Sequence, residues 1–150
     1  MVSKRIVAIA SAGGHWQQLM LLRPAFEDHT VHYVTTMKGL PEKFDAQPAS
    51  IVPDCNRNKP FTALLSALAI TFEMLKRRPH VVISTGALPG VIGLAVGRLF
   101  GARTIWIDSV ANGEEMSMSG SLARPFARLW LTQWETVSEQ SGAEFSGRVI

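Results

Sequence analysis

Three short segments of the sequence combine glycine or other small residues with side chains that could bind a phosphate or move a proton. They are residues 11–15 (SAGGH), residues 84–90 (STGALPG) and residues 108–115 (DSVANGEE). Glycine lets backbone amides approach a ligand closely, and a turn that leads into a helix N-terminus favours phosphate oxygens. A tight strand-to-helix turn without any ligand also needs glycine, so the first segment alone fits either interpretation.

The histidine at the end of the first segment is the residue most suited to proton transfer. With an intrinsic pKa of about 6.5, His15 could act as a general base for a sugar hydroxyl or bind a phosphate, and a capping or structural role is equally compatible. The other histidines, His29, His32 and His80, have no metal-ligand spacing and are expected to be ordinary surface or strand-edge residues. No metal site is predicted.

The third segment places carboxylates and amides where they could hold sugar hydroxyls. Asp108 could equally cap a helix or lie in solvent as a loop charge. The sequence has no Ser-His-Asp or Cys-His order that indicates hydrolysis, and no carboxylate pair that indicates a glycosidase. It also lacks the G-x-G-x-x-G and P-loop fingerprints, which argues against a free-standing nucleotide-binding enzyme.

Strands and helices that would position these segments alternate along the chain. Continuous apolar or β-branched runs predict strands, and apolar residues at helical spacing predict helices. Strands are expected at residues 4–11, 31–36, 50–52, 81–83 and 104–107, and helices from residue 15 and over 60–78, 89–100 and 122–130. This alternation predicts an α/β fold with a Rossmann-like, doubly wound parallel sheet. Because ligands bind such a sheet at the carboxyl ends of its strands, the three segments should meet there.

Two of the expected helices carry apolar residues that could lie on a surface. The helix over 60–78 is apolar almost all round, which indicates deep burial or contact with a membrane or partner. In the helix over 122–130, Arg124 and Arg128 lie one turn apart beside Phe126 and Trp130. Such a pattern suits anionic headgroups, although an amphipathic helix with a solvated basic face gives the same pattern.

Composition limits the remaining possibilities. The chain has 150 residues and a net charge of +3, which fits one domain and gives little support to nucleic-acid binding. The longest uncharged stretch, residues 81–97, contains Pro89 and falls short of the roughly 20 apolar residues that span a bilayer. The single cysteine, Cys55, cannot form an internal disulfide, and no secretory signal is visible, so a cytoplasmic protein is expected.

Five segments in order along the chain resemble one glycosyltransferase family. They are IVAIASAGGHWQQL, VVISTGALPG, TIWIDSVANGEEMSMSG, LTQWE and FSGRVI. Together they resemble the acceptor-and-anchor subunit of the two-subunit transferase that adds the second N-acetylglucosamine in the dolichol pathway. The resemblance is closer to the bacterial exopolysaccharide branch of the PssD type.

The resemblance implies that residues 1–150 form one acceptor-binding domain, the N-terminal half of a GT-B fold. A separate donor-binding subunit would supply the UDP-sugar, with no further cofactor. The family's Glu-Ser pair appears here as Asp108-Ser109, a shorter acid. The residues expected to hold the acceptor diphosphate or its sugar are Gly13, Gly14, His15, Thr85, Gly86, Asp108, Ser109 and Asn112, with His15 as the catalytic candidate.

The expected reaction is metal-independent transfer of a hexose, glucuronic acid or N-acetylglucosamine from a UDP donor to a polyprenyl-diphosphate-linked sugar, in exopolysaccharide or capsule synthesis. Eukaryotic members begin with a membrane-spanning helix, and no such helix is predicted in this sequence. Peripheral attachment at the cytoplasmic face of the inner membrane is therefore expected here. The residues expected to contact membrane or partner are Phe61, Leu65, Phe72, Arg124, Arg128, Trp130, Gln133 and Trp134. Residues 147–150 are expected to form a last strand, at the point where a one-chain relative would cross into its donor domain. A non-catalytic scaffold that recruits the catalytic subunit to the membrane is the alternative.

Overall fold

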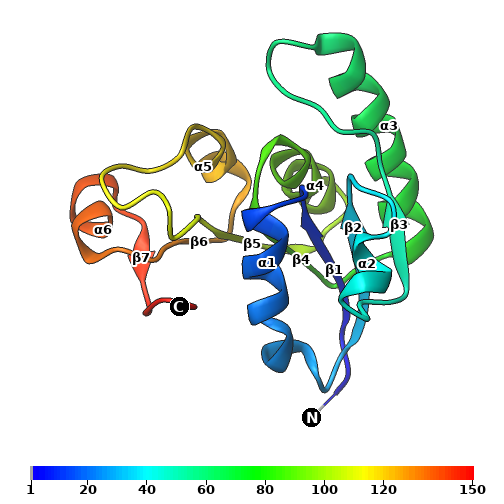
Figure 1. The fold of residues 1–150 in the computed structure, drawn as a ribbon, viewed down its shortest axis with the longest axis horizontal. Coiled ribbons are helices and arrows are strands. Elements are labelled where there is room, and N and C mark those ends of the chain that lie inside the picture. Colours follow the sequence, from blue (N-terminus) through cyan, green and yellow to red (C-terminus); the bar gives the residue numbers. More distant parts are fainter. Residues whose placement is uncertain (1) are drawn as a thin grey trace.

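The computed structural model describes residues 2–150 and contains one seven-stranded parallel sheet. The strands lie in the order β3-β2-β1-β4-β5-β6-β7 (Figure 1). They are β1 (Arg5–Ala10), β2 (Thr30–Thr35), β3 (Ala49–Ile51), β4 (Val81–Gly86), β5 (Arg103–Ile107), β6 (Leu129–Thr132) and β7 (Glu144–Phe145). The predicted α/β, Rossmann-like doubly wound fold is confirmed.

Helices connect each strand to the next. They are α1 (Gly14–Leu21), α2 (Leu40–Lys43), α3 (Pro60–Arg77), α4 (Leu88–Leu99), α5 (Met118–Ala123) and α6 (Glu135–Ser141), with short 3-10 turns at Arg23–Phe26 and Arg124–Phe126. In Figure 1, α6 and β7 lie at one end of the molecule and α3 lies at the other.

The sheet separates two apolar cores because side chains alternate between the faces of each strand. On β1, Ile6 and Ala8 pack toward Trp16 and Leu19 of α1. Val7 and Ile9 pack on the other face with side chains of α3, α4 and α5. Alternate residues of β1 therefore pack against the helices on opposite faces of the sheet.

The sheet reverses its strand order between β1 and β4, which are neighbours although β2 and β3 come between them in the sequence. The loops after these two strands leave the sheet side by side at its carboxyl edge. This is the place where doubly wound sheets bind ligands. It brings the first two of the three predicted segments together.

The expected helix over residues 122–130 is wrong. A helix instead begins at Met118, where the Ser117 side chain accepts a hydrogen bond from the Gly120 amide at 2.8 Å, and it ends at Ala123. Pro125 lies in the 3-10 turn that follows, and Leu129–Thr132 form strand β6, in which Trp130 pairs with Trp106 of β5. Proline has no amide to continue a helix, and the sheet edge offers Leu129 and Leu131 backbone partners.

Residues 147–150 do not form the expected last strand. The last strand is β7, and Gly147 adopts a left-handed φ of 105°. The Val149 amide donates to the side-chain oxygen of Gln133 at 2.9 Å instead of to a neighbouring strand. The C-terminal segment is therefore held by a side chain rather than by sheet pairing.

Helix α3 presents an uncovered apolar face. Its inward side chains are Ser66, Ile70 and Met74. The outward face carries six large apolar side chains with exposed fractions between 41% and 71%: Phe61, Leu64, Leu65, Leu68, Phe72 and Leu75. We call these six residues the α3 apolar stripe. Of the two interpretations of this helix, deep burial is therefore wrong. Within residues 2–150, no helix has both the length and the apolar character needed to cross a bilayer.

Candidate functional site

A cavity of about 410 Å³ lies at the carboxyl edge of the sheet, between the loops that follow β1, β4 and β5. All three predicted segments line it. The predicted site residues that line this cavity are Gly14, His15, Gly86, Ser109 and Asn112. His15 is the single residue with a titratable side chain among those that line it, and no carboxylate reaches its wall. The cavity therefore suits an uncharged or anionic group.

The tautomer of His15 follows from its contacts. Its Nδ1 atom lies 3.1 Å from the carbonyl oxygen of Thr85, and the Thr85 hydroxyl donates to the His15 carbonyl. A carbonyl oxygen can only accept, so Nδ1 must carry the hydrogen when the ring is neutral. Nε2 is then an unprotonated acceptor, and no partner for it is found among residues 2–150. Such a nitrogen can take a proton from a bound hydroxyl.

Gly86 leaves the space that the imidazole occupies. Its φ is +141°, and a Cβ built at this position would lie 2.2 Å from Nδ1 of His15. A side chain here would push the ring out of its place beside Thr85. The second predicted segment therefore serves His15 in two ways, through the Thr85 carbonyl and through the missing side chain of Gly86.

Two helices begin at the cavity. Gly13 precedes α1 with a φ of 85°, and Gly14 and His15 form the start of that helix. Gly86 and Ala87 lead into α4 and line the same cavity. The first amides of a helix have no partner within it and carry partial positive charge. Their convergence favours an anionic group such as a phosphate.

The Ser109 hydroxyl is oriented by its neighbours. It accepts a hydrogen bond from the Gln18 side chain at 2.9 Å and another from the Ala111 amide at 3.1 Å. With both lone pairs used, its own hydrogen remains available to donate. Because Ser109 lines the cavity, it is a ready donor to an oxygen atom bound there.

Asp108 lies beneath the cavity rather than in its wall. It is 1% exposed and accepts hydrogen bonds from the Trp106 indole at 3.0 Å, from the Ser117 amide at 2.9 Å and from the Ser117 hydroxyl at 2.5 Å. These contacts fix the loop between β5 and α5. Asp108 is thus a buried loop anchor, which is neither the helix cap nor the solvated charge that the sequence left open.

A buried pair of glutamines joins this loop to the rest of the site. The Gln133 side chain donates to that of Gln18 at 2.7 Å, and the Gln18 oxygen also accepts from the Val110 amide at 3.0 Å. Gln133 also donates to the Asp108 carbonyl at 2.9 Å. Helix α1, the loop after β5 and the segment after β6 are therefore held as one unit.

The residues expected to meet a membrane or partner are scattered in the structure. Phe61, Leu65 and Phe72 belong to the exposed α3 apolar stripe. Gln133 is 2% exposed, so its side chain serves the interior of this chain, contrary to expectation, because it must satisfy the buried Gln18. Trp134 is half-buried under Arg148, whose guanidinium lies 4.1 Å from the ring centroid.

The remaining three do not share a helix face. Arg124 and Arg128 are exposed, but the helical turn expected to align them is absent. Trp130 is half-buried in β6; its indole donates to the Gly120 carbonyl at 2.8 Å, and Arg124 lies 5.0 Å from its ring centroid. Their grouping as a basic amphipathic helix is therefore wrong.

Sequence reasoning missed part of the cavity wall. The lining residues that it did not choose as site residues are Ala87 and Ala111, which lie within the predicted segments, and Ser117, Met118 and Ser119, which lie outside them. The signal for the last three was the Ser-Met-Ser run that follows the third segment, since serine often caps a helix. Gln18 gave no such signal, because an amide on a predicted helix face has the same pattern whether it is solvated or buried.

One histidine also differs from expectation. His29 and His80 accept hydrogen bonds from the Lys4 and Arg5 amides near the surface. His32, in contrast, is 6% exposed and lies between the Ser50 hydroxyl at 2.7 Å and the Glu73 carboxylate at 3.4 Å. It is a buried polar contact between the sheet and α3, because β2 is an inner strand.

Comparison with known proteins finds sequence similarity to a glycosyltransferase subunit. No family model matches the chain. The chain is 32% identical over 96 residues to the UDP-N-acetylglucosamine transferase subunit ALG14 of Candida albicans, which covers 59% of this chain and 44% of that protein. It is 31% identical over 81 residues to ALG14 of Eremothecium gossypii, covering 50% and 36%. The matched region thus spans less than half of either relative.

Solved structures share the fold at low sequence identity. MurG of Acinetobacter baumannii superposes with a TM-score of 0.79 and 14% identity over 98% of this chain and 46% of that enzyme. UDP-GlcNAc 2-epimerase of Neisseria meningitidis gives 0.73 and 8% identity over 97% of this chain and 47% of that enzyme. The chain therefore has the fold of the N-terminal half of GT-B enzymes and is distantly similar in sequence to ALG14.

Proposed function

We propose that this chain is the acceptor-binding subunit of a split, UDP-sugar-dependent glycosyltransferase. The observation that carries the proposal is the cavity where His15, Ser109 and two helix N-termini converge. Its acceptor would be a sugar linked to a polyprenyl diphosphate, and its product would extend a polysaccharide repeat unit. Distant similarity to the UDP-N-acetylglucosamine transferase subunit ALG14 supports N-acetylglucosamine as the first donor to test.

The wall of the cavity supports an acceptor diphosphate. Backbone amides at the starts of α1 and α4 would donate to the phosphate oxygens, and the Ser109 hydroxyl would add a donor. No carboxylate lines the cavity, so an anion meets no like charge on its wall. Asn112 and Ser119 line the same cavity and would hold sugar hydroxyls.

His15 would serve as the general base. The acceptor hydroxyl attacks the anomeric carbon of the donor, the bond from that carbon to the UDP oxygen breaks, and the hydroxyl proton moves to Nε2 of His15. UDP leaves with the electron pair of the broken bond. The hydrogen bond from Nδ1 to the Thr85 carbonyl keeps Nε2 available and stabilises the imidazolium that forms.

The donor would be held by a separate subunit. This chain corresponds in fold to just under half of the solved enzymes that it resembles, and the ALG14 relatives are transferase subunits. We therefore expect this chain to bind acceptor alone and to transfer sugar only with a donor-binding partner.

Peripheral contact with the membrane would place the cavity near its lipid-linked substrate. The α3 apolar stripe would lie in the interfacial region, because six exposed large apolar side chains on one helix face are costly in water. This attachment needs no spanning helix within residues 2–150.

Radiolabelled sugar transfer tests the proposal. The chain would be incubated with a panel of UDP-sugars and host lipid extract, alone and after co-expression with the protein encoded beside it. Transfer only in the co-expressed sample is expected. Transfer by the chain alone would contradict the split enzyme, and transfer in neither sample would contradict the activity.

The exposed α3 apolar stripe also favours a second candidate, a non-catalytic scaffold that recruits a complete enzyme to the membrane. A scaffold does not need His15 for turnover. If the co-expressed complex transfers sugar equally well with His15→Ala, the scaffold is the better account.

A further inference from the structure

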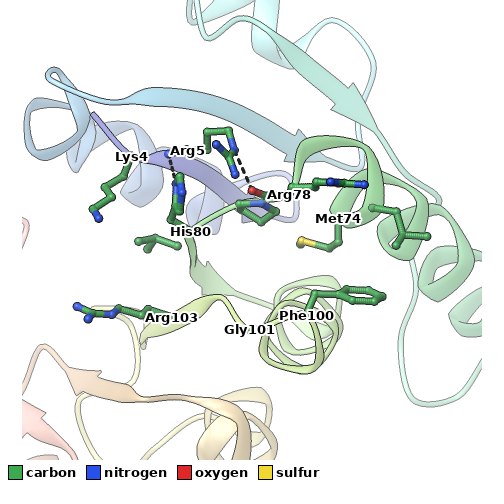
Figure 2. A pocket seen from close by; sticks show the side chains of 11 residues that line it. Lys4, Arg5, Met74, Arg78, His80, Phe100, Gly101 and Arg103 are labelled. Atoms are coloured by element: carbon green, nitrogen blue, oxygen red, sulfur yellow. Dashed lines mark hydrogen bonds between the residues drawn. The ribbon is translucent and has the colours of Figure 1, made fainter. Parts of the chain in front are cut away.

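A second cavity lies at the opposite edge of the sheet from the acceptor site. It has a volume of about 630 Å³ and is formed by the starts of β1, β4 and β5 and the ends of α3 and α4. Figure 2 shows Lys4 and Arg103 on one side of it and Met74 and Phe100 on the α3 side. The proposed transfer reaction makes no use of this cavity.

Four cationic side chains line this cavity: Lys4, Arg5, Arg78 and Arg103. No carboxylate is among the lining residues, and within residues 2–150 the carboxylate found in contact with basic side chains is that of Glu73, which faces Arg77 and His32. Clustered cations without counter-charges repel one another, which favours a bound anion. Arginine side chains match phosphate oxygens through paired N–H groups.

Some basic residues at this edge have a simpler explanation. Arg78 follows the C-terminus of α3, where a cation complements the helix dipole. That reason does not extend to Lys4, Arg5 and Arg103, which lie just before or at the first residue of a strand. Arg5 has a structural role of its own, because its side chain donates to the Arg78 carbonyl, so Lys4 and Arg103 are the two charges without a structural reason.

Hydrogen bonds hold the cluster in place. Arg5 donates through Nε to the Arg78 carbonyl at 2.9 Å, and its amide donates to Nδ1 of His80 at 2.9 Å (Figure 2). Since Nδ1 of His80 accepts, neutral His80 carries its hydrogen on Nε2. His80 lines the cavity, so this N–H adds an uncharged donor to the four cations.

Apolar side chains continue from this cavity to the surface. Leu75 lines it and also belongs to the α3 apolar stripe, with 55% exposure. Phe100 lines it with 52% exposure, and the neighbouring Leu99 is 83% exposed. A free phosphate would have no use for this rim, whereas a phospholipid has acyl chains beside its phosphate.

We propose that this cavity binds the phosphate headgroup of an anionic phospholipid while the α3 apolar stripe contacts the acyl region. A single ligand then contacts both the cations and the apolar rim. The inference deepens the membrane contact proposed for the α3 apolar stripe and does not depend on sugar transfer.

Vesicle co-sedimentation with the wild-type chain tests the lipid class. The probes are vesicles of phosphatidylcholine alone and of phosphatidylcholine mixed with phosphatidylglycerol. The double variant Lys4→Gln/Arg103→Gln should lose about 25-fold in affinity for the mixed vesicles, at about fivefold per charge. Its binding to phosphatidylcholine should not change. Lys4 and Arg103 are exposed and make no side-chain hydrogen bond within residues 2–150, so folding should be retained, as circular dichroism would check.

The matched control is Lys38→Gln/Lys43→Gln, which removes the same charge from exposed positions after β2 and in α2. If both double variants lose the same affinity, general surface charge is responsible and the headgroup site is wrong. Stripe variants such as Leu68→Ser/Phe72→Ser should weaken binding to both kinds of vesicle. If the stripe variants bind both kinds of vesicle as well as the wild type does, the α3 contact is wrong, but the headgroup site is not contradicted.

Inorganic phosphate distinguishes a lipid from a free anion. Partial desolvation and the Arg5 and Lys4 charges lower the pKa of His80, so an anion in the cavity should raise that pKa, as measured by histidine proton NMR. A rise with mixed vesicles and little change with millimolar inorganic phosphate is expected. Saturation by phosphate, together with unchanged binding of the Lys4→Gln/Arg103→Gln variant to mixed vesicles, would overturn the lipid assignment.

Discussion

At the residue scale, the hydrogen bond from His15 to the Thr85 carbonyl leads to a direct test of catalysis. His15→Ala should lower kcat of the co-expressed complex by about 10²-fold or more, because no other titratable side chain lines the cavity. The matched control is His29→Ala, which removes a histidine that bonds the Lys4 amide far from this site. Equal activities of the two variants would contradict a base at position 15.

Gly86 makes a steric prediction about the same imidazole. In Gly86→Ala the new Cβ would press on Nδ1 of His15, whereas Gly39→Ala places a Cβ in open space. The φ angle is positive at both positions, +141° at Gly86 and +85° at Gly39, so both changes strain the backbone and only Gly86→Ala adds a clash. Gly86→Ala should lower the free energy of unfolding by about 1–3 kcal/mol more than Gly39→Ala. Urea titration measures this, and equal losses would show that the ring can move aside freely.

Sequence predicted the residues of the cavity better than their roles. Loops after three neighbouring parallel strands must share an edge, so His15, Gly86 and Ser109 could be grouped without coordinates. Whether a polar side chain faces the cavity or lies beneath it depends on packing. Asp108 turns inward because the Trp106 indole and the Ser117 hydroxyl donate hydrogen bonds to it there. These partners are near in sequence, but their spacing alone does not show which way each side chain points.

At the scale of elements, α3 gives the sharpest contrast between neighbours on one helix. Leu68 is 60% exposed, and Ile70 is fully buried against the sheet. Ile70→Ala should cost about 2–5 kcal/mol of unfolding free energy. Leu68→Ala should change it by no more than about 0.5 kcal/mol. Chemical denaturation of the two variants measures the difference, and a large cost at Leu68 would mean that the stripe is covered in the free chain.

The same helix shows where periodicity succeeds and where it fails. A proline at the first turn, an apolar repeat and basic residues at the end predicted α3 correctly. Periodicity could not tell which apolar face would be buried, since both were apolar. Near Trp130 a helical spacing was accidental, because Leu129 and Leu131 pair with the β5 backbone and Pro125 breaks the helix.

At the scale of the whole molecule, His32 makes stability depend on pH. Burial and the nearby charges of Arg77 and Lys76 lower the pKa of His32, while Glu73 opposes them. Since the unfolded chain binds this proton more readily, stability should fall as pH drops through about 6.5, with a slope from this group of at most about 1.4 kcal/mol per pH unit.

Urea unfolding of the wild type and of His32→Gln, at neutral and mildly acidic pH, measures this contribution as a difference of differences. The Ser50 hydroxyl and the Glu73 carboxylate that face His32 remain in both proteins, so the two proteins differ only at position 32. If the two proteins lose stability in parallel as pH falls, His32 does not carry the effect.

The glutamine pair connects regions that are far apart in sequence, and its removal should therefore be felt at several places at once. In Gln133→Leu, the buried Asp108 carbonyl and the part-buried Val149 amide each lose their bond to this side chain. The Gln18 oxygen keeps only its bond from the Val110 amide. An unsatisfied buried polar group costs about 1–3 kcal/mol, so global stability should fall by at least that much. The surface change Gln140→Leu serves as control, since that side chain is exposed.

Hydrogen exchange then separates a local loss from a shared one. The Val110 amide bonds Gln18 and the Val149 amide bonds Gln133, so both report on the pair from opposite sides. If the pair is one unit, Gln133→Leu should speed exchange at both amides beyond the change in global stability, and loosen the loop that carries Ser109. Faster exchange at Val149 alone would mean that the C-terminal segment moves without affecting the cavity. In that case, binding of a partner to the C-terminal segment could not change the acceptor loop through Gln133.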